Sequence, residues 1–154
     1  LTGKMDADGN LNWTAPAGNW VIVRIGHTST GHTNYTGGAG LGLEVDKFNA
    51  KAVKLQFDNW FGKAFAQDAA LAKEVLKVFH IDSWECGSQN WSSVFQAEFK
   101  KRRGYDIVEY LPVMAGIPVE SANFSEKVLY DVRKTIADLV ADNFYGTVAQ
   151  IAKE

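Results

Sequence analysis

The sequence has little cysteine, no excess of charge and no long apolar run. Its single cysteine, Cys86, excludes a disulfide within the 154 residues. There are 16 Lys and Arg against 18 Asp and Glu, a formal net charge of -2, so no basic face for nucleic acid is expected. No apolar run reaches the length of a membrane span. Residues 37–42 are glycine-rich but match neither a dinucleotide nor a phosphate-loop motif. These absences argue against nucleotide, nucleic-acid and membrane partners.

What the sequence does contain is typical of a folded domain. Hydrophobic residues make up 46% and charged residues 22%, a composition that supports one core rather than a disordered chain. Five Trp is high for this length, and surplus aromatic residues are common in proteins that handle carbohydrate.

The other features are organised around an apolar run that turns abruptly polar. Residues 75–81 fit a strand buried on both faces, and the polar stretch 82–91 follows at its expected carboxyl end. In α/β proteins that end of a strand is where binding and catalytic side chains gather. The combination of acid, amide and indole suits a sugar, which offers hydroxyl groups and C–H faces. The stretch holds Asp82, Trp84, Glu85, Gln89, Asn90 and Trp91.

The order of elements predicts an α/β fold that is a fragment of a (β/α)-barrel. Residues 1–26, with a turn at 6–10 and a β-branched run at 20–26, predict a β-hairpin contributed by an adjoining β module. Residues 27–154 predict part of the barrel. Its helices are expected after Asn49, from Ser92 or Ser93 to Gly104, and from Asn123 to the end of the chain. A short helix from Asp106 is expected to stop at Pro112.

Several blocks of the sequence resemble glycoside hydrolase family 106. They cover nearly the whole chain and come in the order 24–31, 42–47, 81–91, 99–106, 110–112 and 131–138. The resemblance implies an inverting α-L-rhamnosidase of a bacterium that degrades plant polysaccharides, with calcium at the site. Such proteins are large and have a (β/α)-barrel core with β-sandwich modules. The chain is then a fragment, and a periplasmic or extracellular location is implied although no signal peptide opens it.

Glu85 is the candidate catalytic carboxylate and is interpreted as the general acid. Inverting hydrolysis needs one acid to protonate the leaving oxygen and a second carboxylate to activate water. Flanking tryptophan would raise the pKa of this carboxyl by desolvation, as an acid near neutral pH requires. The second carboxylate is expected beyond residue 154. The alternative is that Glu85 only hydrogen-bonds substrate or a metal.

The other candidates have weaker signals. Asp82 points away from Glu85 in an extended strand, so it is interpreted as a supporting or turn residue, with metal or substrate contact as the alternative. Glu44 and Asp46 are candidate substrate or calcium contacts, with Glu44 the candidate metal ligand; the alternative is a helix-start acid paired with Lys47. Candidate sugar contacts are Trp84, Gln89, Asn90, Trp91, Arg24, His27 and, less directly, His32. The alternative for residues 89–91 is a helix-entry loop that holds its own backbone, and for the histidines a structural or exposed position.

Two rival hypotheses remain beside the hydrolase fragment. One is a carbohydrate-binding or scaffold domain that has lost the chemistry, and the other is a structural piece that only packs against the rest of its protein. The isolated chain is expected to have little activity. Unpaired sheet edges would also favour homo-oligomers of it.

Overall fold

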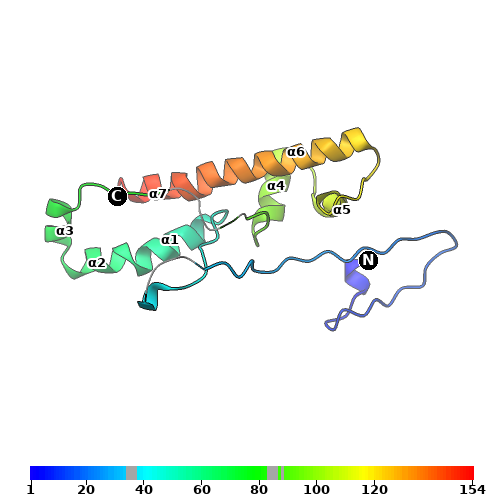
Figure 1. Cartoon of the computed structure of the whole chain (residues 1–154), viewed down its shortest axis with the longest axis horizontal. Coiled ribbons are helices and arrows are strands. Elements are labelled where there is room, and N and C mark those ends of the chain that lie inside the picture. Colours follow the sequence, from blue (N-terminus) through cyan, green and yellow to red (C-terminus); the bar gives the residue numbers. More distant parts are fainter. Residues whose placement is uncertain (34–37, 83–86, 88) are drawn as a thin grey trace.

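The computed structural model describes residues 1–33, 38–82, 87 and 89–154, and it is built mainly from helices (Figure 1). Along the chain they are η1 (Thr2–Lys4), η2 (Gly38–Gly40), α1 (Ala50–Asn59), α2 (Phe61–Gln67), α3 (Ala69–Val75), α4 (Phe95–Arg103), η3 (Val108–Tyr110), α5 (Leu111–Met114), α6 (Ala122–Leu139), the π-helical η4 (Val140–Tyr145) and α7 (Gly146–Ile151).

One long helical rod organises the molecule. α6, η4 and α7 run end to end, α1 packs along η4 and α7, and α4 and α5 pack on α6 (Figure 1). The N-terminal segment extends away from the helices as a long loop. No helix in the described ranges is both long and apolar enough to cross a bilayer.

The apolar periodicity of the C-terminal third correctly predicts this rod. Residues three or four apart share one face of a helix, so a repeating apolar pattern creates a stripe that must be buried. Every member of the predicted stripe is buried or half-buried in the structure: Val128, Val132, Ile136, Leu139, Val140, Phe144, Val148 and Ile151.

The core lies between α4, α5 and α6 and contains a chain of aromatic rings. Successive ring centroids lie 5.0–6.1 Å apart, within the range of favourable aromatic pairs. This chain of rings connects the loop before α1 to the start of α6, so the rings join these elements into one apolar unit. Its members are Phe48, Phe95, Phe99, Tyr105, Tyr110 and Phe124.

Local signals set several helix ends, with three corrections. The helix predicted from Ser92 or Ser93 begins at Phe95, and its N-cap Val94 makes no side-chain capping bond. Asn49 caps α1 by accepting a hydrogen bond from the Lys51 amide, and Gly104 ends α4 with a φ of 83°, both as predicted. The predicted cap at Asn123 is wrong, because Ser121 Oγ accepts the bond from Phe124 N. Pro112 does not stop a helix; it lies in the first turn of α5, where its missing N–H costs nothing.

The predicted strands are wrong. The described residues contain no strand and only two isolated antiparallel bridges, and the side chains expected in a buried sheet are open to solvent: Val21 is 88% exposed and Val78 77%. An extended segment becomes a strand only when a neighbour pairs with its backbone, and no such neighbour lies beside residues 20–26 or 76–81 in the described structure. The β-hairpin and the α/β class of (β/α)-barrel fragment are therefore corrected to a helical architecture. The predicted division at residue 26 stays a prediction.

Charged side chains join α4 to α6. Arg103 donates to Thr135 Oγ1 at 2.9 Å and pairs with Asp138, while Tyr105 Oη donates to Asp131 Oδ2 at 2.9 Å. Lys127 Nζ lies 2.6 Å from the same Asp131 oxygen. The basic end of α4 therefore does more than complement a helix dipole, because it forms cross-helix bonds.

These contacts shift the pKa values of the groups they join. Burial alone would raise the pKa of Asp131, but hydrogen bonds from Lys127 and Tyr105 bring it below the usual value. Burial and the Asp131 carboxylate raise the pKa of Tyr105, which keeps its phenol protonated and donating.

Replacing Asp131 by asparagine is expected to destabilise the helical unit in a pH-dependent way. A carboxylate whose pKa is lower in the folded state stabilises that state above its unfolded pKa, about 3.9, and the contribution is lost as pH falls through the folded value. The melting temperature of the Asp131→Asn variant should therefore be below wild type at pH 6, and the difference should shrink below about pH 4. Calorimetry of the full-length protein measures it.

The exposed carboxylate of Asp58 on α1 provides the control, since Asp58→Asn removes the same charge from a solvent-screened pair with Lys54. A difference for Asp131→Asn that stays constant down to pH 3 would contradict the assignment.

Candidate functional site

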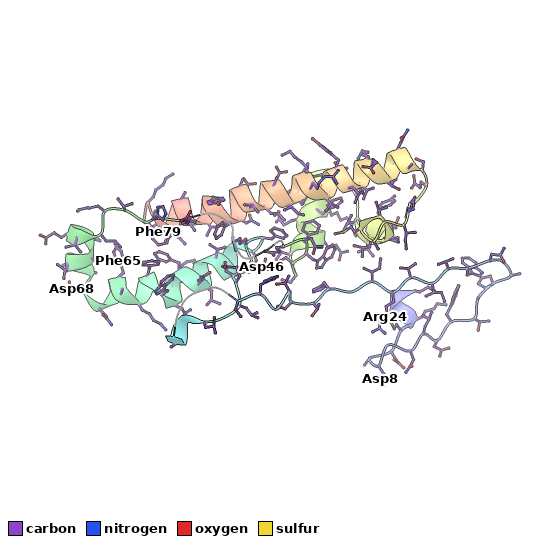
Figure 2. The ribbon with its side chains drawn as sticks, viewed as in Figure 1. Asp8, Arg24, Asp46, Phe65, Asp68 and Phe79 are labelled. Carbon is purple, nitrogen blue, oxygen red and sulfur yellow. The ribbon has the colours of Figure 1, made fainter. Side chains whose placement is uncertain are left out.

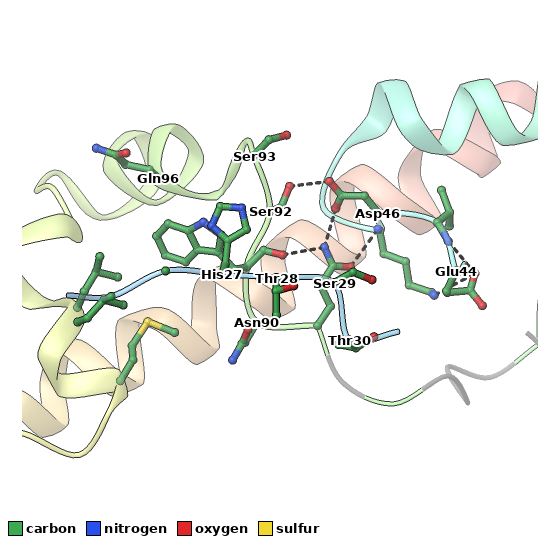
Figure 3. A pocket seen from close by; sticks show the side chains of 18 of the residues that line it. His27, Thr28, Ser29, Thr30, Glu44, Asp46, Asn90, Ser92, Ser93 and Gln96 are labelled. Atoms are coloured by element: carbon green, nitrogen blue, oxygen red, sulfur yellow. Dashed lines mark hydrogen bonds and ion pairs between the residues drawn. The ribbon is translucent and has the colours of Figure 1, made fainter. Parts of the chain in front are cut away.

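A cavity of about 1000 Å³ lies where the N-terminal segment crosses the loops that precede α1 and α4 (Figure 3). Residues 25–30 form one wall, 44–47 a second and 89–93 a third, and Gln96 and α5 complete the lining. Segments that are distant in the sequence therefore meet at one place. Its lining is mixed, with an indole, hydroxyl and amide groups and two carboxylates.

Asp46 holds two of these walls together. Its Oδ1 accepts hydrogen bonds from Gln89 Nε2 at 2.6 Å and from Phe48 N at 3.1 Å. Its Oδ2 accepts one from Ser92 Oγ at 2.6 Å. Figure 3 shows the Asp46 carboxylate joined to Ser92 by a hydrogen bond. Both carboxylate oxygens are thus used to fix loop geometry.

Gln89 completes the connection with its own amide. Its Oε1 accepts from Lys47 N at 3.1 Å, and its Nε2 donates to the Trp91 carbonyl at 3.2 Å as well as to Asp46. Both hydrogens of the amide are therefore used within the protein. Ser92 Oγ also accepts from Val94 N at 3.2 Å, so the loop is fixed at the start of α4.

Lys47 and Glu44 form a partly buried ion pair at the cavity edge. Lys47 is only 5% exposed; its Nζ lies 3.4 Å from Glu44 Oε1 and 5.5 Å from the centre of the Phe144 ring. The same Glu44 oxygen accepts from Val45 N at 3.1 Å. The helix-start acid that pairs with Lys47 is therefore Glu44 and not Asp46.

Glu44, the predicted calcium ligand, and Asp46 do not form a calcium site by themselves. Calcium needs six to eight oxygen ligands, and these carboxylates already bind N–H, O–H and ammonium groups. Within the described ranges no cluster of three or more acidic, His or Cys side chains could hold a metal ion.

Two side chains are placed to contact a ligand directly. Trp91 is half-buried, with its ring 5.0 Å from that of Phe95 on the core side and 6.2 Å from His27 on the cavity side. Asn90 is exposed, and its amide has no hydrogen-bond partner among the described residues. Both residues line the cavity, and an indole and an amide are groups that can bind a polar ring.

The whole chain matches one known protein family. A family model for glycoside hydrolase family 106, described as alpha-L-rhamnosidase, covers residues 1–154. The chain belongs to this family. A solved structure of a rhamnosidase from Novosphingobium sp. PP1Y is similar to 99% of the chain, with a TM-score of 0.79 and 34% sequence identity.

A curated relative is named for a different sugar. A Formosa agariphila protein, provisionally named a beta-glucuronidase, is 42% identical over 147 residues, or 95% of the chain. The chain spans 13% of that relative and 15% of the Novosphingobium rhamnosidase. This family 106 chain is thus similar to a small part of much larger glycoside hydrolases.

Besides Asp46, the cavity brings together five of the predicted site residues of this family 106 chain. They come from three separate segments and are His27, Glu44, Gln89, Asn90 and Trp91. Their predicted roles stay predictions, but Gln89 is engaged within the protein, whereas Asn90 and Trp91 face the cavity with groups that can bind.

Other predicted residues lie elsewhere. Arg24 packs against the turn at Gly9, and Figure 2 shows it near Asp8, away from Asp46. The side chain of Asp82 is 85% exposed, and its carboxylate lies 3.9 Å from His80. Trp84 and Glu85 lie outside the described residues, as does Cys86.

Sequence reasoning missed the roles of Asp46 and Ser92. The sequence predicts Asp46 only as a ligand contact or a partner of Lys47, and Ser92 only as a helix cap. Asp46 is followed two residues later by the buried Phe48, whose amide it binds, so an Asx-type turn was a readable signal. Nothing local indicates its bonds to the 89–93 loop.

Proposed function

We propose that the full-length protein is a glycoside hydrolase that releases terminal α-L-rhamnose from plant polysaccharides. The observation that carries this is the cavity beside Trp91 and Asn90, in a chain that matches family 106 over all its residues. An indole face can stack on the C–H face of the sugar, and the amide and hydroxyl groups can bind its hydroxyls.

In the proposed reaction Glu85 acts as the general acid and protonates the leaving oxygen. A carboxylate elsewhere in the full-length protein activates water on the opposite face of the ring, so the anomeric configuration inverts. The stretch that carries Glu85 leads directly into Gln89 and Trp91, which line the cavity. The proposal of a calcium requirement rests on the family resemblance only. The activity of the full-length protein after treatment with a chelator tests it.

The charges that line the cavity favour a neutral sugar over a uronic acid. Among the described lining residues the formal charges are those of Glu44, Asp46 and Lys47, which leave an acidic balance. The ammonium group of Lys47 is already paired with Glu44. A glucuronate carboxylate would have to be desolvated next to two acids, which costs free energy unless a cation binds it.

The full-length protein is therefore expected to hydrolyse an aryl α-L-rhamnoside at least about 100-fold faster, in kcat/KM, than an aryl β-D-glucuronide. Release of the aryl alcohol measures both rates, and NMR of the first sugar product gives its anomeric configuration. A preference for the glucuronide would contradict the proposed substrate. Binding of rhamnose without hydrolysis of either glycoside would favour the non-catalytic carbohydrate-binding domain.

A further inference from the structure

We propose that Asp46 is a positioning residue that aligns the substrate-binding loop, acting through hydrogen-bond geometry and not through its charge. The proposal rests on the proposed function, since it concerns the same cavity. Asp46 accepts three hydrogen bonds, from Gln89, Ser92 and Phe48. None of its contacts in the described structure is with a cationic side chain.

The donors of these bonds show which residues Asp46 holds in place. Gln89 and Ser92 are the residues on either side of Asn90 and Trp91, the pair that faces the cavity. With both flanking positions bound to one carboxylate, the intervening residues have little freedom to move.

The carboxylate is itself anchored to the core. Phe48 N binds Asp46, the Phe48 side chain is fully buried, and Asn143 Nδ2 donates to the Phe48 carbonyl at 2.6 Å. The loop before α4 is therefore held, through Asp46, against the η4 part of the helical rod. This continuity explains why a side chain that offers no free oxygen can still govern the geometry of the cavity.

An asparagine at position 46 can reproduce this network without the charge. Its oxygen can accept from Gln89 Nε2 and Phe48 N, and its amino group can donate to Ser92 Oγ, because a hydroxyl is both donor and acceptor. An alanine removes all three bonds. Asparagine and alanine variants therefore separate a positioning role from a role as a catalytic, substrate-binding or metal-binding carboxylate.

The test measures kcat/KM of the full-length protein on an aryl α-L-rhamnoside for Asp46→Ala and Asp46→Asn. For Asp46→Ala we expect kcat/KM to fall about 100-fold, because the binding groups of the loop are then misplaced. For Asp46→Asn we expect kcat/KM to fall less than about 10-fold, with an unchanged pH profile. Asp131→Ala is the matched control, because Asp131 also accepts two side-chain bonds but does not line the cavity. It is expected to stay near wild type.

Three results would overturn the proposal: equal losses for Asp46→Asn and Asp46→Ala, wild-type activity of Asp46→Ala, or an equal loss for Asp131→Ala. Hydrogen–deuterium exchange provides a readout that needs no activity. Asp46→Ala should speed exchange of the Lys47 and Phe48 amides about tenfold, because the loss of about one hydrogen bond has an effect of that size. Asp46→Asn should leave the exchange of both amides unchanged. Failure of the proposed hydrolase function would leave this second readout intact.

Discussion

Glu85→Gln in the full-length protein is expected to lower kcat on an unactivated α-L-rhamnoside about 1000-fold, within the range that general acid catalysis supplies. Glutamine keeps the size and polarity of the side chain but cannot deliver the proton that the departing oxygen needs. The expected loss is in turnover, because in the proposed site Trp91, Asn90 and their neighbours bind the sugar.

The leaving group makes this prediction specific for an acid. A dinitrophenyl rhamnoside needs little protonation, so Glu85→Gln should retain far more activity on it than on a sugar or alkyl glycoside. The exposed Glu126 on α6 provides the control, and Glu126→Gln should match wild type on both substrates. An equal loss on activated and unactivated glycosides would assign Glu85 to substrate binding, and no loss on either would remove it from the reaction.

Phe95→Ala is expected to cause the largest loss of stability, about 3–5 kcal/mol for the helical unit. The ring is fully buried at the start of α4 and contacts Phe48, Phe99 and Trp91. Its removal takes away apolar contacts and leaves a cavity that the rigid aromatic neighbours cannot fill. Thermal unfolding of the full-length protein, with hydrogen–deuterium exchange to locate the change in α4 and α6, measures the effect.

Phe95→Leu is the matched variant, since it keeps most of the apolar volume and should cost less than half as much. The half-buried Phe65 of α2 lies outside the aromatic chain, and Phe65→Ala should also cost less. A Phe95→Ala protein with wild-type exchange in α4 and α6 would show that the aromatic chain is not the core of this unit.

How far the sequence predicts the fold depends on the range of the interactions involved. The cap at Asn49, the end of α4 at Gly104 and the apolar face of α6 to α7 depend on residues within one or two helical turns, and each was predicted correctly. The strands at 20–26 and 75–81 were not, because the apolar pattern of a strand says nothing about whether a partner is present.

The same distinction applies to the site. Residue chemistry marked His27, Glu44, Gln89, Asn90 and Trp91, and all of them line the cavity. It also marked Arg24 and Asp82, which the structure places outside the lining. Residue type shows what a side chain can bind, but its direction depends on backbone geometry that the sequence pattern left open.

By itself, then, the sequence determined the family, the residue types at the site and the helices whose signals are local. Only the tertiary structure decided which side chains hold the site together. The bond from Gln89 to Asp46 joins residues 43 positions apart, and the bond from Asn143 to Phe48 joins residues 95 apart. Such contacts form when separate helices pack on a common core, and they leave no periodic or neighbouring signal in the sequence.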